Sequence, residues 1–118
     1  MRSRLVVKVT AGADAPERCA QAFTVASVAL AAGAEVSLWL TGEASWFAVA
    51  GHAEAFVLPH SAPLADLRDA VLADGTLTLC TQCAARRSIT DVLPGVRLAG
   101  AAAFVAEVMA EGTQALVY

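Results

Sequence analysis

The chain has 118 residues, a length typical of one domain rather than two. Hydrophobic residues make up 58% of it and charged residues 16%, whereas typical soluble domains contain roughly 45–50% and about 25%. This composition excludes intrinsic disorder, which requires low hydrophobicity and high charge. So few charges on so small a domain leave two explanations: a membrane, or surfaces buried between subunits.

The membrane explanation fails on length. A membrane-spanning helix needs roughly 20 consecutive apolar residues, and the best candidate, residues 22–34, is short and interrupted by Thr24 and Ser27. The first ten residues also lack the long apolar segment of a signal peptide. We therefore expect a cytoplasmic protein that does not bind membranes.

The number and distribution of charged residues indicate which partners the chain can bind. Net charge is −3, and the eight Lys and Arg residues are scattered apart from the pair Arg86-Arg87, so we expect no binding of nucleic acid. Burial between copies then accounts for the apolar excess, and the chain is not expected to be a monomer. Trp46, Phe47 and Leu58 are candidates for the subunit contact because aromatic and apolar residues are enriched at interfaces.

The hydrophobic pattern and the residues that begin and end helices predict the first secondary-structure elements. Residues 4–10 (RLVVKVT) are β-branched and predict a strand. A long Ala-rich helix follows, with Asp14 as its N-cap and Glu17 completing a capping box. Gly33 ends this helix, and residues 35–40 (EVSLWL) predict the second strand.

The remaining elements alternate in the same way. In chain order we expect a short helix or turn at 42–50, a short strand at 54–58, a helix at 63–73 with Ser61 as its N-cap, a turn at 74–75, strands at 76–80 and 96–98, helices at 81–87 and 101–110, and a last strand at 114–118. Strands and helices joined by short connections favour a parallel sheet covered on both faces. In such sheets the site lies beyond the carboxyl ends of the strands, here after Leu40 and Leu79.

Cys80-Thr81-Gln82-Cys83 follows Leu79 and is the strongest chemical signal in the sequence. Cys80 is expected where a strand ends and a helix begins, where free N–H groups and the helix dipole stabilise a thiolate. Cys83 lies about one helical turn further and is placed to act as a resolving thiol. Four alternatives stay open for the pair: buried structural thiols, a redox sensor, thioredoxin-type redox chemistry, or a zinc site.

Zinc is the weakest of these alternatives. It requires two further ligands, and His52 and His60 stand alone in loop-like sequence. We therefore expect no metal. Gly12 and Gly42 follow strands but form no phosphate-binding fingerprint, so no cofactor is expected either.

Three other residues have simpler interpretations. Cys19 is expected to fill space on the long helix. Arg86 and Arg87 are expected to complement the C-terminus of their helix rather than to hold an anion, because they lie about 9–10 Å along the axis from Cys80.

Residues 80–89 (CTQCAARRSI) resemble the segment around the active cysteine of the DsrE/DsrF-like sulfur-relay family, which includes TusD-like subunits. Residues 94–105 (PGVRLAGAAAFV) resemble the family's following segment. Further similarity covers 4–10 with the helix after it, 63–80, and 114–118. Most of the chain is thus covered, as one domain over residues 1–118.

The resemblance implies a three-layer α/β/α sandwich with a mainly parallel five-stranded sheet, assembled into trimers or hexamers. It also implies a cysteine that receives sulfane sulfur as a persulfide, and Cys80 matches that position. The chain departs from the family pattern twice. Ser88 stands where the family commonly has Gly, and Cys83 adds a second thiol that can attack a persulfide.

The functional hypothesis is a sulfur carrier or sulfurtransferase-like protein that acts through Cys80, with a persulfide donor and a small acceptor protein as partners. The alternative is a non-enzymatic oligomeric module in which Cys80 and Cys83 form a redox-sensing or structural pair.

Overall fold

The computed structural model describes residues 2–118. The strands are β1 (Arg4–Val9), β2 (Glu35–Leu40), β3 (Thr76–Cys80), β4 (Arg97–Ala99) and β5 (Thr113–Val117). The helices are α1 (Pro16–Ala31), the 3₁₀ helix η1 (Gly42–Ala48), α2 (His52–Ala55), α3 (Leu64–Asp74), α4 (Thr81–Arg86) and α5 (Ala101–Val108). Across residues 2–118, none of these helices is both long and apolar enough to cross a membrane.

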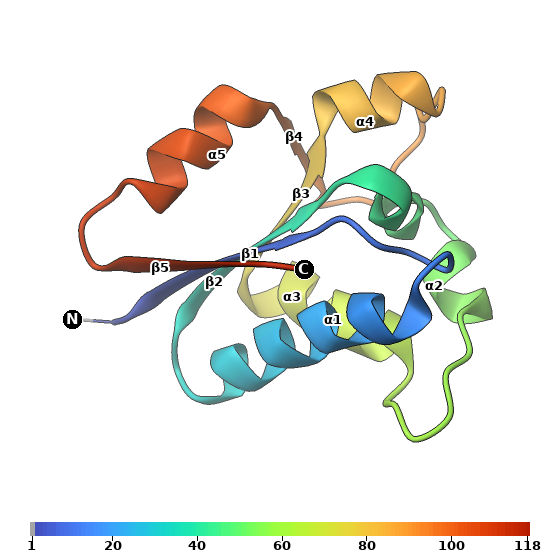
Figure 1. The fold of residues 1–118 in the computed structure, drawn as a ribbon, viewed down its shortest axis with the longest axis horizontal. Coiled ribbons are helices and arrows are strands. Elements are labelled where there is room, and N and C mark those ends of the chain that lie inside the picture. Colours follow the sequence, from blue (N-terminus) through green and yellow to red (C-terminus); the bar gives the residue numbers. More distant parts are fainter. Residues whose placement is uncertain (1) are drawn as a thin grey trace.

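The five strands form one sheet in the order β4-β3-β2-β1-β5, and every neighbouring pair is parallel. Helices α1 and α3 lie on one side of this sheet, and α4 and α5 lie on the other (Figure 1). The predicted α/β/α sandwich with a five-stranded sheet is therefore confirmed. All five carboxyl ends meet at one edge of the sheet, which is where the loops of interest begin.

The sheet face toward α1 and α3 is apolar. Alternate strand residues such as Val7, Leu38 and Leu79 are fully buried there, together with Phe23 of α1. Phe47 of η1 packs edge-on against Phe23, with 5.9 Å between the ring centroids. Since Phe47 is buried in this core, the prediction that it contacts another subunit is wrong. The corresponding predictions for Trp46 and Leu58, which are partly exposed, stay predictions.

The opposite face mixes polar and apolar residues, and Val6, Trp39 and Thr78 are buried on it. Helix α5 lies over it but buries none of its residues. The carboxylate of Glu107 on α5 accepts hydrogen bonds from Ser37 Oγ at 2.6 Å and from Trp39 Nε1 at 3.2 Å, and it pairs with Arg97. Phe104 packs edge-on against Trp39, with ring centroids 5.4 Å apart. Polar contacts and one aromatic pair thus hold α5 to the sheet.

The start of α1 differs from the prediction. Its N-cap is Ala15, with no side-chain hydrogen bond, so the predicted capping box is wrong. The Asp14 carboxylate instead accepts a hydrogen bond from the backbone N–H of Gly12 at 2.8 Å, two residues upstream. This local bond stabilises the turn after β1 and competes with capping. The other end is as predicted, since Gly33 follows α1 with a positive φ of 91°.

The segment between η1 and α3 also differs. Residues 54–58 do not form a strand, because the single-turn helix α2 occupies His52–Ala55. Ser61 is not an N-cap, since Pro63 holds that position and α3 begins at Leu64.

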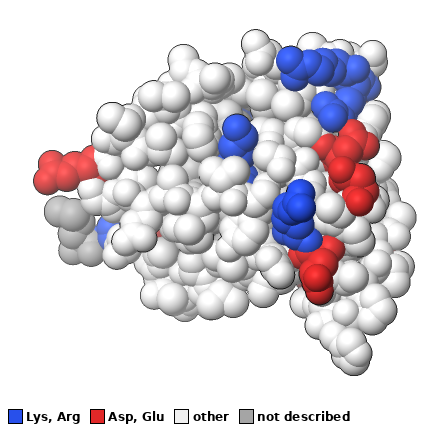
Figure 2. Space-filling view, in the orientation of Figure 1, with Lys and Arg blue, Asp and Glu red and all other residues white. Residues whose placement is uncertain are grey.

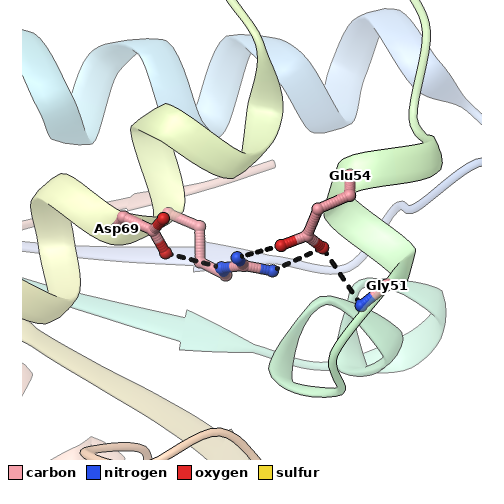
Figure 3. A network of polar contacts seen from close by, with 4 residues as sticks. Gly51, Glu54 and Asp69 are labelled. Carbon is pink, nitrogen blue, oxygen red and sulfur yellow. Dashed lines mark hydrogen bonds and ion pairs between the residues drawn. The ribbon is translucent and has the colours of Figure 1, made fainter.

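Arg68 explains why this segment is helical (Figure 3). It lies on α3 and is only 2% exposed. Its guanidinium donates to both carboxylate oxygens of Glu54, at 3.2 and 2.6 Å, and to Asp69 at 3.1 Å. Glu54 also accepts from the Gly51 N–H at 3.1 Å. The carboxylate therefore ties α2 to α3, a contact that a strand at this position would lose.

Candidate functional site

A cavity of about 320 Å³ opens at the carboxyl edge of the sheet. Its walls come from the ends of β1, β2 and β3 and from the start of α4 and α5, namely Lys8, Thr10, Trp39, Thr41, Gly42, Cys80, Gln82, Cys83, Ala101 and Phe104. The loops after Leu40 and Leu79 thus meet where the strand pattern predicted. A larger cavity of about 500 Å³ beside η1 and α2 contains no thiol in its lining.

Cys80 is the last residue of β3 and the N-cap of α4, and its side chain is partly exposed in the cavity. Burial alone raises the pKa of a thiol. Here that effect is outweighed by hydrogen bonds from the backbone and side chain of Cys83, by the backbone of Gln82 and by the charge of Lys8, so the net pKa of Cys80 is lowered from 9.0. A lowered pKa increases the thiolate fraction, which is the nucleophilic form.

Cys83 lies in the first turn of α4 and is 9% exposed. Its sulfur accepts a hydrogen bond from the backbone N–H of Gly42 at 3.4 Å. Gly42 has a φ of +53°, and a Cβ there would lie 2.4 Å from the carbonyl oxygen of Thr10. Only glycine lets the loop after β2 approach β1 this closely while its N–H reaches the thiol.

Lys8 is the cationic wall of the cavity. It lies near the end of β1, and its Nζ lies 5.2 Å from the centroid of the Phe104 ring. Lys8 takes part in none of the ion pairs found among residues 2–118. Its charge is therefore available to anions in the cavity. The sequence signal was a single Lys within the apolar run RLVVKV, which did not by itself point to a site.

Other candidate residues lie elsewhere. Cys19 is fully buried in the core, and burial, aided by the charge of Asp14, raises the pKa of its thiol to about 12. His52 stacks on Trp46 with ring centroids 5.2 Å apart, and His60 is exposed. Within residues 2–118 there is no group of three or more His, Cys, Asp or Glu side chains that could hold a metal ion.

The arginines after the cysteines lie at the end of α4. Arg87 donates to the carboxylate of Glu43 at 2.8 Å and to the carbonyl oxygen of Cys83 at 3.2 Å. It therefore complements the helix C-terminus, as predicted, and also ties α4 to η1. Arg86 is exposed. Ser88 follows with a φ of +54°, the left-handed conformation that favours glycine.

Comparison with known proteins places this chain in a family. No curated protein matches the chain. The crystal structure of the ychN protein from E. coli is similar over 100% of both chains, with a TM-score of 0.80 and 15% sequence identity, which supports the fold. The sequence pattern of the DsrE/DsrF-like family matches residues 3–118. The chain therefore belongs to the DsrE/DsrF-like family, and this membership implies a function related to sulfur relay.

Proposed function

We propose that this protein carries sulfane sulfur as a persulfide on Cys80 and passes it to an acceptor thiol. The observation that carries the proposal is the environment of Cys80. Its thiol is partly exposed in a cavity at the start of α4, and interactions with Cys83, Gln82 and Lys8 outweigh the effect of burial and lower its pKa. These are the properties of a reactive cysteine rather than of a buried structural one.

The transfer involves two displacement steps. The Cys80 thiolate attacks the outer sulfur of a donor persulfide, and the sulfur–sulfur bond of the donor breaks. The donor leaves as a thiolate, and Cys80 becomes Cys80–S–SH. An acceptor thiolate then attacks the same outer sulfur, and the Cys80 thiolate leaves with its electron pair. No external oxidant or reductant is needed, because each step exchanges one sulfur–sulfur bond for another.

The cavity suits these anionic species. Lys8 contributes a positive charge, and the aromatic rings of Trp39 and Phe104 provide apolar walls. A persulfide is deprotonated more readily than a thiol, so the charge of Lys8 favours the loaded as well as the unloaded anion. The apolar walls limit the access of water, which strengthens the attraction.

We also propose that the chain works as an oligomer of identical subunits. Large apolar side chains are exposed on and beside α5: Leu98, Val105, Met109 and Val117 are between 54% and 78% exposed. Figure 2 shows few charged side chains over α5 and β5, while most of the visible charges gather over the side that carries η1, α2 and α4. An apolar surface of this kind is typical of a contact between subunits.

Intact-protein mass spectrometry tests the carrier proposal. Wild type, Cys80→Ser, Cys83→Ser and Cys19→Ala are incubated with glutathione persulfide, and the donor is then removed by gel filtration. We expect Cys83→Ser to gain the mass of one sulfur atom and Cys80→Ser to show no added sulfur. Cys19→Ala controls for the third cysteine and should behave as wild type does. Absence of added sulfur on Cys83→Ser would contradict the proposal.

A further inference from the structure

We propose that Cys83 discharges the persulfide on Cys80, releasing the sulfur as sulfide and leaving a Cys80–Cys83 disulfide. This step rests on the proposed loading of Cys80. It gives the chain a second outcome besides transfer to an acceptor thiol. The class of substrate is then a persulfide, and the product is inorganic sulfide.

The two cysteines lie in one turn of the chain and line the same cavity. Cys80 is the N-cap of α4 and Cys83 lies three residues on, so both face the same side of the first turn. Both side chains are in the lining of the cavity at the carboxyl edge of the sheet. A disulfide requires a sulfur–sulfur distance of about 2.05 Å. A spacing of three residues across the first turn of α4 places the two side chains as neighbours, so we expect the disulfide to form by local adjustment.

The structure also supports Cys83 as a nucleophile. The Gly42 N–H donates a hydrogen bond to its sulfur over 3.4 Å, which fixes the position of the sulfur beside the cavity. The Cys83 backbone is fixed too, because Arg87 donates to its carbonyl oxygen and pairs with Glu43 of η1. A purely space-filling thiol would not require a backbone donor held in place by a left-handed glycine.

The two thiols differ in their exposure to solvent, and this difference assigns them different roles. Cys80 is open to the cavity, whereas Cys83 is 9% exposed. External donors therefore reach Cys80 first. The inner sulfur of the loaded persulfide stays next to Cys83, and the outer sulfur is the one that leaves. Lys8 in the cavity wall attracts the departing anion.

The atoms and electrons balance. The Cys83 thiolate attacks the inner sulfur of Cys80–S–SH, the bond between the inner and outer sulfurs breaks, and HS⁻ leaves. Two electrons from the two cysteine sulfurs reduce the sulfane sulfur to sulfide, and the cysteines become a disulfide. A further cycle requires a dithiol reductant that returns both cysteines to thiols.

The test follows loaded protein after removal of glutathione persulfide, with no reductant added. Wild type is expected to release about one sulfide per chain and to lose the mass of two hydrogen atoms relative to the reduced protein. Cys83→Ser is expected to keep its added sulfur, with release slowed at least about 100-fold, because an adjacent thiol has a high effective concentration. Cys83→Ala serves as a second variant in case the serine hydroxyl disturbs the site, and Cys19→Ala should match wild type.

The two proposals fail differently. If Cys83→Ser and Cys83→Ala load but wild type holds its sulfur equally long and forms no disulfide, the discharge step is wrong and the carrier proposal stands. If neither variant loads, the carrier proposal is wrong and the discharge step fails with it. A disulfide that joins Cys19 to either cysteine would also overturn the assignment to Cys83.

Discussion

At the residue scale, the chemistry depends on how the surroundings of Cys80 oppose its burial. Burial raises the pKa of the thiol, and hydrogen bonds from Cys83 and Gln82 together with the charge of Lys8 lower it further than burial raises it. The sequence pattern predicted the hydrogen-bonding contribution, because a strand-to-helix junction follows directly from the alternation around Cys80. It did not predict Lys8, because only the folded sheet and α5 bring that side chain to the cavity.

The first prediction concerns the pH dependence of Cys80 alkylation. Because the thiolate reacts with iodoacetamide and the pKa of Cys80 is lowered, the rate should reach half its maximum below pH 9.0. Lys8→Met removes a positive charge and should move this midpoint to higher pH. Arg86→Met, which removes an exposed charge further along α4, is the matched control and should leave it nearly in place. Equal midpoints in Lys8→Met and wild type would contradict the role of Lys8.

The second prediction concerns Ser88. Its φ of +54° costs a residue with a Cβ about 1 kcal/mol. Ser88→Gly should therefore raise the free energy of unfolding by about 1 kcal/mol, measured by urea denaturation. Ser88→Ala keeps the Cβ and should bring no such gain. A loss of stability in Ser88→Gly would show that the hydroxyl contributes more than the strain costs.

At the element scale, the cavity depends on the close approach of the loops after β1 and β2. A Cβ on Gly42 would lie 2.4 Å from the carbonyl oxygen of Thr10, and one on Gly12 would lie 2.6 Å from that of Glu43. Both contacts involve backbone atoms, which cannot move aside as a flexible side chain can. Gly12 and Gly42 are therefore needed so that the two loops can pack this closely. The sequence analysis considered these glycines only as possible phosphate-binding residues and did not predict this role.

Gly42→Ala provides the third prediction. The clash and the positive φ together should lower the free energy of unfolding by roughly 2–4 kcal/mol. Gly112→Ala is the control, because Gly112 also has a positive φ, of 77°, but a Cβ there meets nothing within 4 Å. It should cost only about 1 kcal/mol. Equal losses in the two variants, measured by urea denaturation, would show that strain alone matters and that the loops can separate freely.

The fourth prediction concerns the contact between α2 and α3. Pairing with Arg68 lowers the pKa of Glu54 from 4.5 to about 2. A carboxyl whose pKa is lowered by folding stabilises the fold above its unfolded pKa, and this contribution is lost as the pH falls from about 4.5 toward 2. Glu54→Gln should therefore flatten the decline of the melting temperature over this range.

The control for that measurement is Asp66→Asn, a change on α3, the helix that carries Arg68, at an exposed carboxylate that takes part in none of the ion pairs among residues 2–118. It should leave the acid limb of the stability profile largely unchanged. If Glu54→Gln and wild type decline in parallel between pH 4.5 and 2, the ion pair seen in Figure 3 does not stabilise the fold as described.

The elements themselves show how far the sequence determines the fold. The three inner and two edge strands could be predicted because β-branched and leucine-rich segments between turns have few other solutions. Residues 54–58 could not, since their apolar run resembles a strand while the ion pair that keeps Glu54 on a helix comes from Arg68, 14 residues away. The N-cap of α1 was missed for a similar reason, because Asp14 binds backward to Gly12.

At the scale of the whole molecule, an exposed apolar surface lies on and beside α5. Helix α5 buries no residue within the subunit, although its sequence is almost entirely apolar. The network of Glu107 with Ser37, Trp39 and Arg97 holds the helix on the mixed polar and apolar sheet face and directs its apolar side outward. The sequence composition predicted a subunit interface, but Phe47, one of the three residues suggested for it, lies in the core.

The fifth prediction tests this surface. Val105→Glu and Met109→Glu place a charge on exposed positions of α5 and should shift the chain to a smaller species in size-exclusion chromatography with light scattering. Val28→Glu, at an equally exposed position on α1 across the sheet, is the matched control and should leave the mass unchanged. A monomeric wild type would contradict the proposed oligomer.

Localising the added sulfur tests the account most directly. After loading with glutathione persulfide, Cys83→Ser is alkylated and digested with trypsin, which cuts after Arg68 and Arg86 and leaves Cys80 in one peptide. Fragment ions from that peptide are predicted to place the alkylated extra sulfur on Cys80. A peptide that carries only the alkyl group there, or extra sulfur found on Cys19 instead, would contradict the account.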